Sequence, residues 1–304
     1  KVLFFLVFPI YSFSQTTYYS RVTGNWDVAA TWSTVGCGGV AAATPPGATD
    51  NAIVCGPHTV TMTADETINN LTINSAGILN DGGNRPTATG NLTLNGTING
   101  VAASSRWTLS GAGATIDGSG ACNIGDRFEI SGNKSVLASA SIAFTGMTGV
   151  VRRLSVLSGT VTNNGIVTLS NTDLVDVGAW TNASGSTLNA SDQIDAIITF
   201  NASASGNTVN YNGAGAQNIR VPSDASYHHL TISGSGTKLL LGAADVNGTV
   251  SILGTAALNV NSFNITLGGN WNNNSTSPDP FIEGIQTVTL DGGAAQTIDA
   301  ALAQ

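Results

Sequence analysis

The chain of 304 residues is polar without being highly charged: 41% of its residues are hydrophobic, 9% are charged and 37 are glycine. A disordered chain would combine few apolar residues with a high net charge, and an ordinary globular domain carries about 25% charged residues. Roughly a third of the chain is Thr, Ser or Asn, which favour turns and strand faces, whereas the Glu and Lys needed on exposed helix faces are scarce. The composition therefore excludes most helical and α/β folds and indicates an all-β protein.

The N-terminal segment predicts export. A positive charge at Lys1 precedes an apolar run from Val2 to Tyr11 and the small-x-small triplet Ser12-Phe13-Ser14. A membrane anchor needs about 20 apolar residues, about twice the length of this run. We therefore expect a signal peptide over residues 1–14, a secreted or cell-surface location, and no membrane span once the signal is removed.

The charge balance argues against nucleic acid as a partner. Without Lys1 the chain has 9 basic and 18 acidic residues, so its net charge is 9 minus 18, or −9. Such a surface repels phosphate backbones, and the one adjacent basic pair, Arg152-Arg153, would point to opposite faces of a strand. Surface glycans or other cell-surface proteins are the expected partners.

Cys37 and Cys55 are expected to form a disulfide. In an exported protein two isolated cysteines are expected to pair, and closing a loop of about 18 residues stabilises by around 3 kcal/mol. The alternative is a metal site that adds His58, but structural zinc normally has four ligands and only three are present. The third cysteine, Cys122, is expected to be a buried free thiol. We expect no metal or cofactor, although calcium remains compatible with the sequence.

Residues 15–66 are predicted to form an N-terminal cap. The segment combines Trp26 and Trp32 with the two cysteines and several prolines, unlike the rest of the chain. A solenoid needs such a cap because its first coil exposes unpaired backbone groups and apolar area.

Residues 67–304 are expected to form the repeats. Short runs such as NLTIN, HLTIS and FNITL alternate apolar and hydroxyl residues and are bounded by Gly, Asn or Asp, which is typical of half-buried strands. Similar runs return after about 21 residues, as from Leu71 to Leu92, which predicts a right-handed parallel β-helix with three strands per coil and about a dozen coils. Tandem antiparallel β-sandwich repeats are the alternative. The expected core stripe comprises Val60, Met62, Leu71, Ile73, Leu92, Leu94, Val209, Tyr211, Leu230, Ile232, Val250, Ile252, Ile265, Leu267, Val288 and Leu290.

The sequence also contains a repeat with a period longer than one coil. The segment TVNYNGAGAQNI at residues 208–219 matches TVTLDGGAAQTI at residues 287–298. The simplest interpretation is duplication of a module of several coils.

The opening motifs resemble the start of large secreted surface proteins of Bacteroidota. Those proteins share a G-N-W-[DN]-x-x-x-T-W motif, a Pro-Gly-x-x-Asp turn and a G-x-H-T-V-T strand. The corresponding positions here are Gly24, Asn25, Trp26, Asp27, Thr31, Trp32, Pro46, Gly47, Asp50, Gly56, His58, Thr59, Val60 and Thr61. The resemblance implies an adhesin-like β-helix exported by type nine secretion. Family members end in a sorting domain, so we expect this chain to be an N-terminal fragment of a longer reading frame.

Parallel β-helices also include polysaccharide lyases and hydrolases, so a catalytic site is an alternative for this sequence. Glycoside hydrolysis needs two carboxylates within about 5 to 10 Å, and a calcium-dependent lyase needs an acidic cluster with a basic residue. The best grouping is Asp117, Asp126 and Glu129 beside Arg127. We interpret the three carboxylates as solvated turn residues and expect no catalytic site.

Two classes of function follow. We favour a structural or adhesive, non-catalytic solenoid that serves as a stalk or a binding surface at the cell surface. The alternative is a polysaccharide-binding or pectate-lyase-like β-helix, in which Trp180 and Trp271 would stack on sugar rings.

Overall fold

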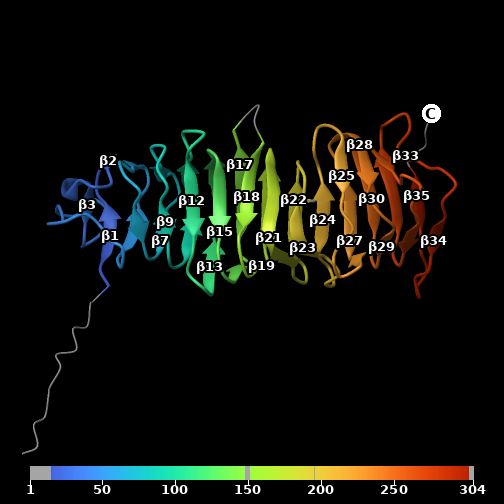
Figure 1. The fold of residues 1–304 in the computed structure, drawn as a ribbon, viewed down its shortest axis with the longest axis horizontal. Helices are drawn as coiled ribbons and strands as arrows, with labels where there is room; N and C mark the ends of the chain where they lie inside the picture. The colour runs from blue at the N-terminus through green and yellow to red at the C-terminus, as the bar shows by residue number, and fades with distance from the viewer. Residues whose placement is uncertain (1–14, 148–150, 195, 301–304) are drawn as a thin grey trace, which may run out of the picture.

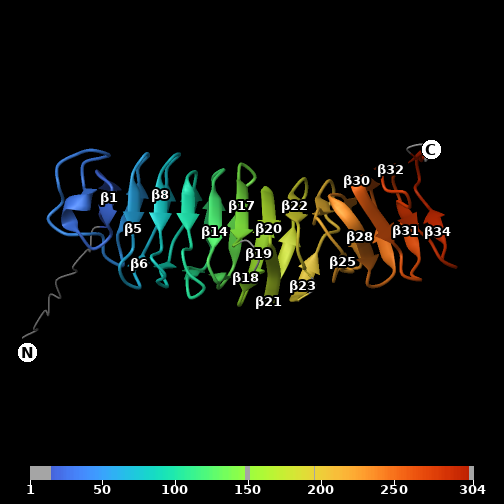
Figure 2. The same ribbon diagram turned by 90° about the horizontal axis from the view of Figure 1, so that it is seen from above.

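The computed structural model describes residues 15–147, 151–194 and 196–300 and shows an elongated β-solenoid of about 11 turns. Strands lie side by side along the whole length, with the N-terminal strands at one end and the C-terminal strands at the other (Figures 1 and 2). Within these residues every strand pairing is parallel except that of β1 with β3. The predicted parallel β-helix is therefore confirmed, and the antiparallel sandwich alternative is wrong. The predicted signal peptide, residues 1–14, lies outside the described residues.

Three walls enclose the core. The first wall comprises β1 (Thr17–Ser20), β3 (Trp32–Ser33), β4 (Asn51–Val54), β7 (Leu71–Ile73), β10 (Leu92–Leu94), β13 (Ala114–Asp117), β16 (Lys134–Val136), β19 (Thr160–Asn163), the end of β21 (Thr172–Asn182) and β23 (Ile197–Asn201), followed by β26 (Ser226–Tyr227), β29 (Ala244–Val246), β31 (Ile265–Leu267) and β34 (Val288–Leu290). The second wall comprises β2 (Gly24–Asn25), β5 (Thr59–Thr61), β8 (Ile78–Asn80), β11 (Thr97–Asn99), β14 (Ala121–Ile124), β17 (Ser141–Gly146), β20 (Ile166–Ser170), β22 (Thr187–Ala190), β24 (Thr208–Tyr211), β27 (His229–Ile232), the start of β30 (Val250–Asn259), β32 (Trp271–Ser275) and β35 (Ile298–Ala300). The third wall comprises β6 (Thr67–Ile68), β9 (Thr87–Ala88), β12 (Arg106–Leu109), β15 (Arg127–Ile130), β18 (Arg152–Val156) and the start of β21, followed by β25 (Gln217–Ile219), β28 (Ser235–Leu240), the end of β30 and β33 (Phe281–Ile282).

The core runs along the solenoid because the same inward position is apolar in successive coils. Leu71 pairs in register with Leu92, one coil later, and both side chains are buried. All members of the expected core stripe are buried except Val288 and Leu290, which are 38% and 40% exposed in the last described first-wall strand. Period-two alternation places the intervening hydroxyl residues on the outside.

The N-terminal end is closed by two tryptophans. Trp26 and Trp32 are fully buried, and their rings meet edge to face with centroids 4.9 Å apart. The indole N–H of Trp32 donates to the carbonyl oxygen of Trp26 at 2.7 Å. The turn between them, η1 (Ala29–Thr31), is the only helical segment in the described part of the chain, so no helix there has the length and apolar character to cross a membrane. The first complete coil begins at Asn51, before the cap boundary expected at residue 66.

The Cys37–Cys55 disulfide is confirmed. The two Cα atoms lie 6.0 Å apart, and the bond ties the cap loop to the end of β4. Because both thiols are used, the zinc alternative is wrong. His58 instead lies with its Nδ1 atom 2.9 Å from the hydroxyl oxygen of Ser20, which accepts a hydrogen bond from the N–H of Cys55 at 2.8 Å. Cys122 is a buried free thiol, as expected, and burial raises its pKa.

The long repeat is a corner motif rather than a duplicated set of whole coils. Gln217 lies at the corner between the second and third walls, and its side chain donates to the carbonyl oxygens of Ala190 and Asp192. The side chain of Gln296 donates to the carbonyl oxygens of Leu267 and Gly269 at the corner between the first and second walls. The two motifs therefore build the same local structure at different corners. Duplication of whole coils would have placed both motifs on the same wall, so that hypothesis is wrong.

A buried lysine occupies the same corner position one coil after Gln217. Lys238 is in register with Gln217, is fully buried, and donates to the carbonyl oxygens of Gly213, Gly215 and Ser235 at 2.8, 2.6 and 2.9 Å. Burial lowers the pKa of Lys238 from 10.5 to about 8. The ammonium group thus satisfies three carbonyl groups at a cost in desolvation.

The register of the core predicts that two neighbouring substitutions lower the free energy of unfolding by different amounts. Ile232→Ala should lower the free energy of unfolding by about 2 to 5 kcal/mol because it opens a cavity between coils. Thr231→Ala, on the outward side of the same strand, should cost less than about 1 kcal/mol. Urea unfolding of both variants measures the difference, and comparable losses would contradict the register.

Lys238 predicts a stability that rises in alkaline solution. Below a pH of about 8 both states carry the charge, and burying it costs stability. Between about pH 8 and 10.5 the unfolded state binds a proton that the folded state has released, so the free energy of unfolding rises with pH. Lys238→Gln, which copies Gln217, should lack this rise. Urea unfolding across that window checks it, and parallel pH profiles for the two proteins would refute it.

Candidate functional site

The four charged residues that the sequence offers for catalysis lie on two different walls. Asp117 ends β13 on the first wall, where its Oδ1 atom accepts hydrogen bonds from the next backbone N–H and from the hydroxyl of Ser139, at 2.8 and 2.9 Å. Asp126 precedes β15 on the third wall, and Arg127 and Glu129 lie within that strand. The structure therefore brings Asp126, Arg127 and Glu129 together and leaves Asp117 in a separate turn.

The third-wall residues form a network of ion pairs. Glu129 Oε1 lies 3.4 Å from Arg106 Nε and 3.8 Å from Arg127 Nη1. Asp126 Oδ2 lies 3.3 Å from Arg127 Nε, and the hydroxyl of Thr108 donates to Glu129 Oε2 at 3.4 Å. Glu129 lies within strand β15 and is only 7% exposed because the guanidinium groups cover it, so its interpretation as a solvated turn residue is wrong. The arrangement is a surface ion-pair network and not an acid and a nucleophile facing each other across a groove.

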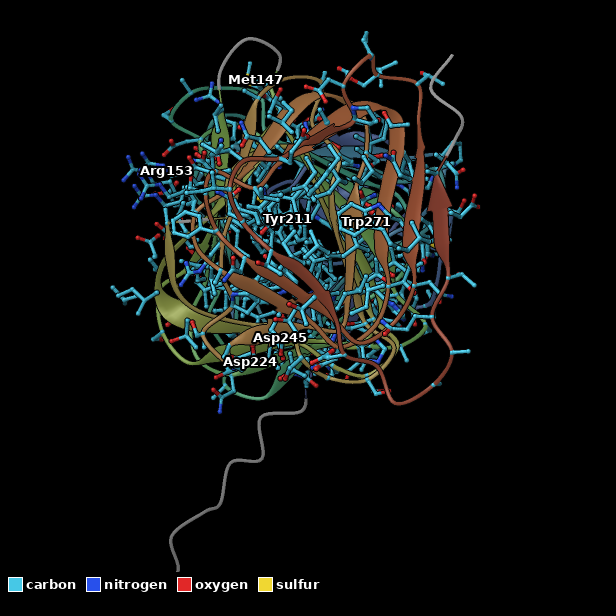
Figure 3. All side chains as sticks on the ribbon, turned by 90° about the vertical axis from the view of Figure 1, so that its right-hand side faces the viewer. Met147, Arg153, Tyr211, Asp224, Asp245 and Trp271 are labelled. Carbon is cyan, nitrogen blue, oxygen red and sulfur yellow. A yellow bond between two sulfur atoms is a disulfide. The ribbon has the colours of Figure 1, made fainter. Side chains whose placement is uncertain are left out.

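The network belongs to a longer row of arginines. In the register of the third wall Arg106 lies beside Arg127, and Arg127 lies beside Arg153. Thr87 lies beside Thr108, so Arg85, two residues earlier, precedes Arg106 in the same row. We call Arg85, Arg106, Arg127 and Arg153 the arginine ladder. Seen from the C-terminal end, Arg153 projects outward from the wall, whereas Tyr211 lies inside it (Figure 3).

A carboxylate side chain lies close to each end of the ladder. Asp173 is in register with Arg153, and the Oδ1 atom of Asp65 accepts a hydrogen bond from the backbone N–H of Arg85 at 2.7 Å. Arg85 and Arg153 are exposed, and within the described ranges no ion pair joins either guanidinium to a carboxylate. The side chains of Arg106 and Arg127 are 32% and 26% exposed. The ladder thus offers guanidinium groups on four successive coils.

Arg152 and Arg153 diverge as the alternation of a strand predicts. Arg153 is exposed on the outer face of β18. Arg152 instead directs its Nη2 atom to the sulfur of Met147, at 3.8 Å, in the preceding loop. Only Arg153 joins the ladder.

Our sequence reasoning missed the ladder although a signal for it was present. Arg85, Arg106 and Arg127 follow one another at equal intervals, and that interval is the coil period. Arg153 follows Arg127 after a longer interval because β17 is longer than β14 and more residues separate β17 from β18 than separate β14 from β15. A search for charged residues at the coil period would have found the first three members.

The two tryptophans proposed for sugar stacking lie on the inner side of the walls. Trp180 is 1% exposed, and its indole N–H donates to Asn182 Oδ1 at 3.0 Å. A sugar ring cannot reach it there, which removes the ligand-binding role expected for Trp180. Trp271 is 8% exposed and packs edge to face on Phe281, with ring centroids 4.9 Å apart. It lines a cavity of about 330 Å³ in the last coils, together with Leu290.

The adjacent histidines are closer than an alternating strand predicts. The rings of His228 and His229 meet edge to face with centroids 4.3 Å apart, because His228 precedes β27 and is not held by its pleat. His229 Nδ1 accepts a hydrogen bond from the backbone N–H of Thr249 at 3.0 Å. Burial, together with the neighbouring His228, lowers the pKa of His229. That hydrogen bond ties His229 to the next coil, which is a structural role.

Metal ligands and known relatives add no further site. In the parts of the chain whose positions are described, no three His, Cys, Asp or Glu side chains gather closely enough to hold a metal ion. Comparison of the chain with protein-family models, curated proteins and solved structures found no match. The arginine ladder and its carboxylates are therefore the candidate site on the strength of their geometry alone.

The ion-pair network predicts different costs for its two carboxylates. Glu129→Gln should lower the free energy of unfolding by about 1 to 2 kcal/mol, because it leaves two partly covered guanidinium groups without their shared partner. Asp126→Asn should cost at most about 1 kcal/mol, because its side chain is 30% exposed. Urea unfolding at low salt measures both, and an equal or larger loss for Asp126→Asn would contradict the assignment.

Proposed function

We propose that this chain is a secreted or cell-surface structural or adhesive protein whose solenoid is a non-catalytic stalk and binding surface. The observation that carries the proposal is the repetition of one outward row over many coils. On the second wall, Thr61, Asn80, Asn99, Asn123, Thr145 and Ser170 lie in register on successive coils. Repeated uncharged hydrogen-bonding groups suit a long rigid surface better than a single reaction centre.

Hydrogen bonds between the row's side chains support a rigid body. The amide of Asn99 donates to Asn80 Oδ1 at 3.1 Å, and the amide of Asn123 donates to Asn99 Oδ1 at 2.7 Å. Stacked amides add side-chain bonds to the backbone ladder along the solenoid axis. Bending the solenoid would have to break both sets.

Export and family membership rest on the sequence. The apolar N-terminal segment has the layout of a signal peptide, and the Cys37–Cys55 disulfide fits an oxidising compartment. We include in the proposal that the chain is a Bacteroidota-type surface protein exported by type nine secretion, for which the opening motifs are the support.

The catalytic alternative is weaker because its residues are separated. Asp117 lies on the first wall, whereas Asp126 and Glu129 lie on the third wall and are paired with arginines. A lyase or hydrolase of this fold needs its acidic residues to converge on one bond of the substrate.

Product release tests the proposal. The purified chain should release no reducing ends or unsaturated products from acidic or neutral polysaccharides, with or without calcium, while beads coated with it should be retained on glycan-bearing surfaces. Asp117→Asn and Asp126→Asn provide matched controls, one on each wall. Turnover that disappears in either variant would place the protein among the polysaccharide-degrading enzymes, and absence of retention on every surface would leave only the stalk role.

A further inference from the structure

The arginine ladder departs from the rule that the other outward rows follow. Elsewhere on the solenoid the outward positions are mostly Thr, Asn and Ser, as in the row of Asn189, Asn210, Thr231 and Ser251. Like charges on neighbouring strands destabilise a sheet, and adjacent coils are only about 4.8 Å apart. Four arginines in succession are therefore a cost to stability that threonine would avoid. Departures of this kind are expected where a surface has a function.

The carboxylates hold the inner arginines without using all their donors. Arg106 contacts Glu129 through Nε, and Arg127 uses Nε and Nη1 for Asp126 and Glu129. A guanidinium group has five N–H donors, so these contacts orient the side chains and leave terminal donors toward solvent. Arg85 and Arg153, at the two ends, are exposed with no carboxylate ion pair in the described ranges.

The length of the ladder indicates an extended ligand. Three coil spacings separate Arg85 from Arg153, which is about 14 Å, so one small anion cannot contact all four guanidinium groups. A linear chain with repeated carboxylate or sulfate groups can do so, because each group meets a guanidinium on a successive coil.

Nucleic acid fits less well than a polysaccharide. The net charge of −8 and the nearby Asp65, Asp126 and Asp173 oppose every polyanion alike, so base stacking has to distinguish the two ligands. Binding of single strands also relies on exposed aromatic side chains for base stacking, whereas Trp107, which follows Arg106 on β12, is 4% exposed and faces the core.

We infer that the arginine ladder binds a linear acidic polysaccharide, through its carboxylate or sulfate groups, along the outer face of the third wall. This inference rests on the proposed function, because it assigns a ligand class to a non-catalytic binding surface. Arg85 and Arg153 form the two ends of the contact, and Glu129 is a positioning residue that holds Arg106 and Arg127.

Affinity measurements on the full chain test the inference. Dextran sulfate and polygalacturonate supply the two anionic groups, and dextran of matched size is the neutral control. Binding to at least one anionic polymer at low salt should be weakened about tenfold by Arg85→Gln/Arg153→Gln. Arg152→Gln removes the same charge beside Arg153 but on the other side of the strand, so it should change the affinity less than twofold. Thermal unfolding verifies that each variant is folded.

The outcomes separate this inference from the proposed function. Equal affinity of the double variant and the unmodified chain, or no preference for the anionic polymers over dextran, would overturn the ladder as a binding site. A single-stranded oligonucleotide that binds as tightly, with the same loss in the double variant, would overturn the assignment to a polysaccharide. Cleavage of a bound polymer, measured in the same samples, would refute the non-catalytic proposal while leaving the ladder as a binding site.

Discussion

The backbone hydrogen bonds between successive coils are the interaction on which the rest of the structure depends. Each strand pairs in parallel with its counterpart one coil later, as Leu71 pairs with Leu92. A residue on one coil is therefore about 4.8 Å from its counterpart on the next, and its side chain has the same direction. Any preference at one position, whether apolar, amide or charged, is consequently repeated as a row along the solenoid.

The corners are where this constraint is most demanding. Backbone groups at a turn cannot all pair with the next coil, so buried or half-buried side chains must satisfy them. Gln217, Gln296 and Lys238 supply donors to carbonyl groups, two each from the amides and three from the ammonium. Where a strand itself turns the corner, the backbone takes a left-handed conformation, at Asp176 with a φ of 86° and at Gly254 with a φ of 68°.

Local periodicity predicted the fold, but the coil register had to come from the structure. Alternation within runs such as HLTIS fixes which residues face inward, and the disulfide was predicted from the isolation of two cysteines in a segment that we expect to be exported. The long repeat was misread because its two similar segments were assumed to occupy the same wall. Trp180 was proposed to stack on a sugar ring, but it faces the core. Its indole N–H can be buried there because Asn182, two residues along the same strand, accepts its hydrogen bond.

The arginine ladder shows why coil length decides what a solenoid surface can do. Arg85, Arg106 and Arg127 align because the coils between them are equal in length, and Arg153 aligns although its coil is longer. The register of the third wall is kept in this longer coil, because Arg127 on β15 still pairs with Arg153 on β18. A surface row is therefore preserved when a longer coil returns to the same strand pairing. This requirement is consistent with a ligand that extends along the axis, since such a ligand depends on unbroken register more than on the shape of any single coil.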